Sequence, residues 1–128
     1  MKKIIPLIFI IFVFASAICV PVFSDAFIDK FNEAKTLYNK KKYTAAAENF
    51  KSAALLTLNA KDQSKAQFNS GLCFKQAGDE EKEDKTYYYI ESMKMFIDSY
   101  KNGDASQKTK IIERLTELIE KELIVTEN

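Results

Sequence analysis

The chain contains no histidine and no tryptophan among its 128 residues. Histidine is the commonest general base near neutral pH and a principal zinc ligand. Its absence excludes Ser-His-Asp and Cys-His catalytic systems and histidine-ligated metal sites. Basic and acidic residues are nearly balanced, at 19 and 18, so the chain lacks the basic excess that non-specific nucleic-acid binding requires. We therefore expect no enzyme activity, no metal or other cofactor, and no nucleic-acid partner.

Proline and cysteine are also scarce, with two residues of each. Both prolines, Pro6 and Pro21, lie near the N-terminus, so no proline interrupts a helix after residue 21. If Cys19 is removed with a leader, Cys73 is left without a partner for an intrachain disulfide. Free cysteine is among the most buried residue types, so we expect Cys73 in the core.

The N-terminus has the layout of a secretory signal, with Lys2 and Lys3 before an uncharged apolar run over residues 4–23. Candidate cleavage sites follow Ala17, Ser24 and Ala26. The run is also long enough to span a bilayer, which makes an uncleaved inner-membrane anchor the alternative. A lipid-modified Cys19 is disfavoured because bulky Ile18 precedes it. We expect export to the periplasm or cell envelope, with residues 1–24 as a signal peptide or membrane anchor and one domain over residues 25–128.

After residue 24, apolar residues recur at spacings of three and four, the period of a helix that faces a core. This period predicts an all-α fold of five helices, over residues 25–38, 43–58, 63–76, 79–100 and from 104 onward. Gly78 and Gly103 are placed where helices end, and Asp62 and Asp79 are placed as helix caps. Asp104 with Gln107 forms a capping-box pattern for the fifth helix. The short breaks predict antiparallel neighbours.

Two of the predicted helices have apolar stripes that we expect to face the core. The inner side of the fourth helix comprises Tyr89, Ile90, Met93, Phe96, Ile97 and Tyr100. The stripe of the fifth helix comprises Ile111, Ile112, Leu115, Leu118, Ile119 and Leu123.

One pattern occurs twice at an offset of 37 residues. Phe31-Asn32-x-Ala34-x-x-Leu37 returns as Phe68-Asn69-x-Gly71-x-x-Phe74. The first copy is followed by Tyr43-x-x-Ala46-x-x-x-Phe50-x-x-Ala53. Ala34 and Gly71 fall where the two helices of a hairpin press closest, so only a small side chain fits there. Together these residues resemble the tetratricopeptide repeat, over about residues 27–92 and about two repeats.

The sequence departs from this family in two respects. The offset of 37 exceeds the family period of 34, which places an insertion near residues 59–65. Glu80 and Glu83 stand where the pattern has an aromatic residue and an alanine. The resemblance implies about four helices in antiparallel hairpins, with the fifth helix as the C-terminal cap that a two-repeat array lacks. A plain helical bundle is the alternative.

The resemblance also implies a concave groove that holds a protein or peptide partner and is lined by the first helix of each repeat. Carried over by position, the groove residues are Phe31, Asn32, Lys35, Tyr38, Asn39, Phe68, Asn69, Leu72, Lys75 and Gln76. Aromatic, amide and lysine side chains suit an extended partner. Phe31 and Phe68 fit the core equally well.

Some members of the family hold a carboxylate with asparagines at the positions of Asn32 and Asn69, helped by a lysine and an arginine one turn apart. Lys110 and Arg114 have that spacing and are the candidate carboxylate contacts. The family's first lysine falls on Ile28 here, which is a departure from that pattern.

These observations predict an exported helical-repeat adaptor that binds a protein or peptide partner in the cell envelope. The alternative is a self-assembling structural subunit of an envelope complex, because a two-repeat array leaves apolar end faces. A homo-oligomer, and membrane association through the N-terminal segment, are expected under these interpretations.

Overall fold

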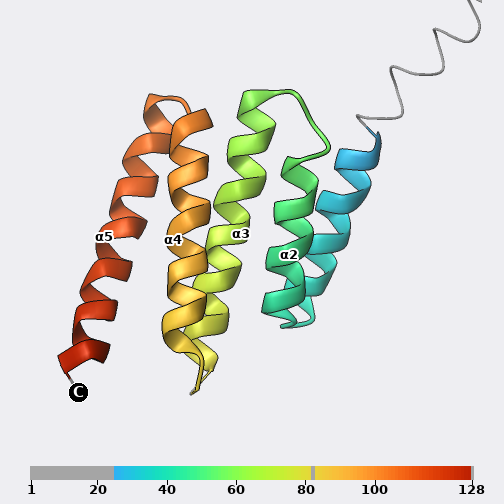
Figure 1. Cartoon of the computed structure of the whole chain (residues 1–128). Coiled ribbons are helices and arrows are strands. Elements are labelled where there is room, and N and C mark those ends of the chain that lie inside the picture. Colours follow the sequence, from blue (N-terminus) through green and yellow to red (C-terminus); the bar gives the residue numbers. More distant parts are fainter. Residues whose placement is uncertain (1–24, 82, 128) are drawn as a thin grey trace, which may run out of the picture.

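The computed structural model describes the backbone of residues 25–81 and 83–127, with side chains up to residue 121. Over these residues the chain forms five helices and no strand, which confirms the all-α class (Figure 1). They are the N-terminal helix (residues 25–39), α2 (Tyr43–Ala54), α3 (Ala60–Glu80), α4 (Lys85–Asn102) and α5 (Ala105–Glu127).

The helices stand side by side and alternate in direction, as the short connections predict (Figure 1). The central helix is α3, which packs against α2 on one side and α4 on the other, while α5 packs on α4. The predicted leader over residues 1–24 lies outside the described residues. Within the described part of the chain, none of the helices combines the length and apolarity that a bilayer crossing needs.

The break between α2 and α3 lies earlier than predicted. Helix α2 ends at Ala54 instead of residue 58, and the loop after it leaves Leu55 84% and Leu58 100% exposed. Helix α3 then begins at Ala60, where the Asn59 side-chain oxygen accepts a hydrogen bond from the backbone N–H of Asp62 at 3.1 Å. Asn59 is therefore the N-cap, and the predicted cap at Asp62 is wrong.

The predicted stop at Gly78 is also wrong, because α3 continues through it to Glu80. Asp79 therefore lies in the last turn of α3 and does not cap α4, which begins at Lys85. Gly78 serves packing instead of a turn: a Cβ there would lie 2.6 Å from an atom of the Tyr89 ring. Its φ is not positive, so its backbone does not require glycine.

Gly71 allows a second close approach between α3 and α4. A Cβ at this position would lie 2.7 Å from two atoms of the buried Phe96 ring. The prediction that only a small residue fits here is thus confirmed. Ala34, Ala46 and Ala53, the small positions of the first hairpin, are fully buried as well.

Buried serines complete the contact between α3 and α4. The Ser99 hydroxyl donates to the Ser64 carbonyl oxygen at 2.7 Å, and the Ser92 hydroxyl donates to the Gly71 carbonyl oxygen at 2.6 Å. Ser64, Gly71 and Gly78 recur every seven residues on α3, as do Ser92 and Ser99 on α4. Small residues therefore allow the two backbones to lie close together, and each of these buried hydroxyls has a hydrogen-bond partner.

The predicted inner faces of α4 and α5 are correct only in part. Tyr89 and Phe96 of α4 form one buried cluster with Ile111 and Leu118 of α5. Five other residues that were predicted to face the core are 39–52% exposed, namely Ile90, Ile97, Tyr100, Ile112 and Ile119. Helix α5 is the last in the row, so none of the other described helices packs on the exposed faces of α4 and α5 that carry these residues (Figure 1).

The predicted capping box at the start of α5 is confirmed, because the backbone N–H of Gln107 donates a hydrogen bond to the Asp104 side chain at 2.9 Å.

Candidate functional site: a groove between the N-terminal helix and α3

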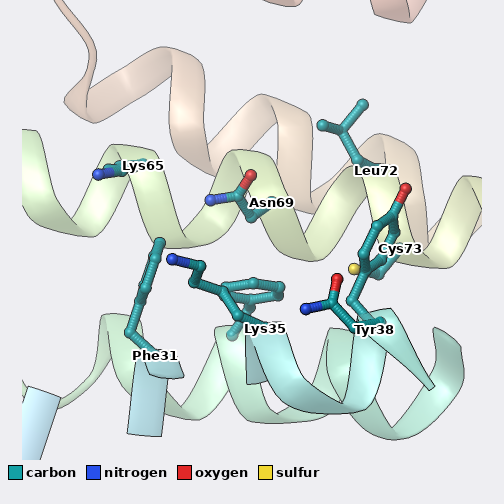
Figure 2. Close-up of a pocket in the computed structure, with 9 residues that line it drawn as sticks. Phe31, Lys35, Tyr38, Lys65, Asn69, Leu72 and Cys73 are labelled. Carbon is teal, nitrogen blue, oxygen red and sulfur yellow. The ribbon is translucent and has the colours of Figure 1, made fainter. Parts of the chain in front are cut away.

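A groove of about 400 Å³ lies between the N-terminal helix and α3 (Figure 2). Its lining comes from three helices and consists of Phe31, Lys35, Tyr38, Asn39, Phe50, Lys65, Asn69, Leu72 and Cys73. Six of the ten groove residues predicted from the sequence are among them, namely Phe31, Lys35, Tyr38, Asn39, Asn69 and Leu72. The structure thus brings together residues from both copies of the repeated pattern.

Helical periodicity explains this arrangement. Phe31, Lys35 and Tyr38 are spaced by four and three residues, which places them on one face of the N-terminal helix. Lys65, Asn69 and Leu72 have the same spacing on α3. In Figure 2, Phe31 and Tyr38 project from the N-terminal helix toward α3, while Leu72 projects from α3 away from the N-terminal helix.

The floor of the groove is apolar and packed against the core. The Phe31 ring packs edge-to-face on Phe50 of α2, with the ring centroids 4.9 Å apart. Phe31 also packs against the buried cluster that contains Ala34, Ala46 and Phe50. Phe31 is therefore both a core residue and a lining residue, so the two interpretations of its role are compatible.

Cys73 lies at the base of the same groove and is buried, as predicted. Burial raises the pKa of its thiol to about 12, so the thiol stays protonated at neutral pH. A protonated thiol is a poor nucleophile, so Cys73 contributes to the shape of the groove and not to covalent chemistry.

The charged groups in the groove lining are both positive. Lys35 and Lys65 are exposed at its sides, and no acidic residue is among the described side chains that line it. The Lys65 ammonium lies 5.3 Å from the centroid of the Phe31 ring, a cation–π distance that holds the charge over the groove floor. Two amide side chains, Asn39 and Asn69, add donors and acceptors. The groove thus combines an apolar floor, amides and positive charge.

Sequence analysis did not place Phe50, Lys65 or Cys73 in the groove, and Lys65 is the charged residue among these three. It also borders two flanking hollows, one of about 120 Å³ shared with Phe68 and Lys110, and one of about 240 Å³ shared with Asn32. Three predicted residues, Asn32, Phe68 and Lys110, therefore lie beside the main groove and not in it. The repeat carried a signal for Lys65, because the 37-residue offset pairs it with Ile28, where the family has a lysine.

The remaining predicted residues contact acidic or polar groups of their own helices. The Lys75 ammonium lies 3.3 Å from an Asp79 carboxylate oxygen, and the Gln76 amide lies 3.5 Å from a Glu80 oxygen. The Arg114 guanidinium lies 3.2 Å from a Glu117 oxygen. None of these three side chains lines the groove.

Asp79 connects three helices at the other end of α3. Its carboxylate accepts hydrogen bonds from the Tyr89 hydroxyl of α4 at 2.7 Å and from the Lys121 ammonium of α5 at 2.8 Å. Partial burial raises the pKa of this carboxyl, but the hydrogen bonds from Lys121 and Tyr89 and the attraction of Lys75 and Lys121 outweigh it and lower the pKa. This cluster fixes α5 against the α3–α4 pair.

No group of three or more histidine, cysteine, aspartate or glutamate side chains is arranged to hold a metal ion within the described residues. Comparison with known proteins gives no match to a family model, to a curated protein or to a solved structure. The tetratricopeptide resemblance therefore rests on the sequence pattern alone.

Proposed function

We propose that this protein is an exported adaptor of the tetratricopeptide type that holds an extended segment of a protein partner in the groove between the N-terminal helix and α3. The observation that carries the proposal is the lining of that groove: an aromatic floor, two amides and two lysines without an acidic side chain among them. The segment that fits this lining carries an apolar side chain next to a carboxylate.

The dimensions of the groove support a side-chain anchor. A hollow of about 400 Å³ is at the lower end of the range for ligand sites, and it accommodates one large side chain with its neighbours. Phe31 and Phe50 supply the apolar contact, while Asn39 and Asn69 suit the backbone amides of an extended chain.

The positive charge of the groove supports the carboxylate proposed for the partner segment. Lys35 and Lys65 come from opposite walls, so a carboxylate in the groove is attracted from both sides (Figure 2). A charge pair at such a partly exposed position contributes affinity and, above all, specificity against basic segments.

The packing of small residues in both hairpins supports the tetratricopeptide type. The small positions of the repeat pattern, Ala34, Ala46 and Ala53, are buried, and Gly71 meets Phe96 closely. The location in the cell envelope follows from residues 1–24 and is proposed on the sequence pattern.

The test is a binding assay with a panel of labelled peptides, each carrying an aromatic or aliphatic residue beside an aspartate, together with the same peptides carrying asparagine. We expect the aspartate peptides to bind more tightly, and Lys65→Glu to weaken their binding about tenfold, a loss of ~1.4 kcal/mol. Lys61→Glu is the matched control, because Lys61 is exposed on the same helix and does not line the groove. Equal binding of both peptide forms, or equal loss in both variants, would contradict the proposal.

A further inference from the structure

A second surface, away from the groove, carries four exposed isoleucines. Ile90 and Ile97 lie on α4 and are 40% and 46% exposed, and Ile112 and Ile119 lie on α5 and are each 52% exposed. We call this surface the isoleucine seam. Solvent-exposed isoleucines are unremarkable singly, but four that share one surface form a patch.

The helix geometry places all four on the same side of the α4–α5 pair. Each isoleucine directly follows a residue of the buried cluster that joins the helices: Tyr89, Phe96, Ile111 or Leu118. One residue further along a helix is a rotation of about 100°. Because α4 and α5 are antiparallel (Figure 1), this rotation turns both pairs toward the same side of the two helices. On α4 this side is away from Ser92 and Ser99, whose hydroxyls bond to α3.

The isoleucines also lie at matching levels along the two helices. The Lys108 ammonium of α5 lies 4.9 Å from the Tyr100 ring centroid of α4, which fixes the register of the pair. In this register Ile97 is level with Ile112, and Ile90 is level with Ile119. The exposed area of the four is roughly 300 Å², the size at which the largest patch of a monomer is often functional.

The charges beside the seam differ between the two helices. On α4 the outer border carries Lys94 and Lys101, whose side chains are 61% and 70% exposed. Each lysine is ion-paired on its own helix, Lys94 with Glu91 at 2.7 Å and Lys101 with Asp98 at 3.8 Å. On α5 the outer border carries the exposed Glu113 and Glu120. The seam is thus an apolar strip with exposed lysines along its α4 edge and exposed glutamates along its α5 edge.

We propose that the isoleucine seam binds a second copy of this chain, across a two-fold axis parallel to the helices. This axis lays α4 of one copy against α5 of the other, so the lysines of each α4 edge meet the glutamates of an α5 edge. In the register above, Lys94 lies two residues, or about 3 Å along the helix axis, from the level of Glu113 of the partner subunit, a distance that the two long side chains can span. A two-fold axis that lies in the plane of the seam but runs perpendicular to the helices would instead lay α4 on α4. That arrangement sets the lysine edges against each other and is disfavoured by like charge.

The size of the contact sets the expected affinity. Helix α4 has 18 residues and is about 27 Å long, and two packed helices form a face about 20 Å wide. Such a face buries on the order of 1,000 Å² in total, the lower end for specific interfaces. We therefore expect a reversible dimer with a dissociation constant in the micromolar range.

The experiment is sedimentation of the protein as its expressing cell produces it, in a neutral detergent matched in density to the solvent, over a range of concentrations. The variants are Lys94→Glu, Glu113→Lys and the two together, with Lys61→Glu as a charge-matched control on α3. Each single reversal creates a like-charge contact, and the double variant restores opposite charges. Circular dichroism checks that each variant stays folded.

We expect the parent to dimerise and either single variant to raise the dissociation constant about tenfold. The double variant should recover the dissociation constant of the parent, and the Lys61→Glu control should leave it unchanged. A parent that remains monomeric at all concentrations would overturn the proposal, and would leave the seam to a different protein. A dimer that none of the variants weakens would also overturn it, because the contact would then lie elsewhere on the chain. Weakening without recovery in the double variant would refute the pairing of α4 with α5.

Discussion

The contact between Gly71 and Phe96 gives a quantitative test of the packing between α3 and α4. In Gly71→Ala, the new Cβ would lie 2.7 Å from two ring atoms of Phe96 and 3.1 Å from a third. Carbon atoms in ordinary contact are about 3.5–4.0 Å apart, so the ring or the helix must move by about 1 Å. Phe96 is fully buried against Phe68, at a centroid distance of 5.5 Å, and against α5. The ring therefore has little room to retreat.

Two opposing effects set the size of the change in unfolding free energy. Overpacking of a filled core costs about 1–3 kcal/mol, and the tight enclosure of Phe96 favours the upper part of that range. Alanine in a helix interior is favoured over glycine by about 1 kcal/mol. We expect Gly71→Ala to lower the free energy of unfolding by about 1–2 kcal/mol, measured by urea titration with circular dichroism.

A double variant separates the clash from other effects of the alanine. Phe96→Leu removes the ring atoms that the new Cβ meets, so the combined loss in Gly71→Ala, Phe96→Leu should fall short of the sum by at least about 0.5 kcal/mol. A Gly71→Ala protein as stable as the parent, or strict additivity in the double variant, would refute this account of the hairpin.

The remaining predictions concern four other positions. Asp79→Asn should lower the unfolding free energy by about 1 kcal/mol at neutral pH. Because the folded state holds the pKa of Asp79 below its ordinary value, this difference in stability should vanish as the pH falls through the folded pKa. A difference that does not change with pH would argue against the ion pairs of Asp79. Ser92→Ala should cost about 0.5–1 kcal/mol in a urea titration, through loss of its hydrogen bond to Gly71, and no loss would show that the bond is energetically neutral. Leu58→Ser should leave stability within about 0.5 kcal/mol of the parent, because Leu58 is fully exposed, and a larger loss would indicate an unseen contact. Tyr38→Ala should weaken peptide binding at a stability cost of about 1 kcal/mol or less, and unfolding at ordinary temperature would refute its placement in the groove wall.

The sequence was sufficient for the fold class and for much of the groove, because both depend on helical periodicity. The pattern around Phe31 and Asn69 predicts which faces of two helices meet, and the structure places both residues in one groove. The small positions were predictable for a related reason. Alanine or glycine at the same place in both copies, as at Ala34 and Gly71, indicates closely packed helices.

The sequence was insufficient where local signals compete with tertiary contacts. Gly78 is a helix terminator by propensity, but the Tyr89 ring occupies the space beside it and the helix continues. The outer isoleucines of α4 and α5, such as Ile97, fit the helical stripe, but the stripe is wider than the area that neighbouring helices cover. The buried serines carried no hydrophobic signal, so only their spacing of seven residues, as in Ser92 and Ser99, indicated their position.

The groove residues also differ in how well they separate binding from folding. Leu72 lines the groove but packs against the cluster of Tyr89 and Phe96 as well, so its truncation removes core contacts. Lys65 is exposed, with its ammonium over the Phe31 ring, and it is not a member of the three buried clusters of the described residues. Substitution of Lys65 is therefore the cleaner test of the binding surface.

The central claim is that the groove between the N-terminal helix and α3 is the partner-binding surface. Site-specific photo-crosslinking in intact cells tests it most directly, with a photoreactive amino acid placed at Asn69 in the groove or at the exposed Glu48 of α2 outside it. We predict a crosslinked partner from Asn69 that is absent from Glu48 and is lost when Lys65→Glu is added, while Lys61→Glu leaves it unchanged. The same crosslinked species from both positions, or one from Asn69 that survives Lys65→Glu, would contradict the account.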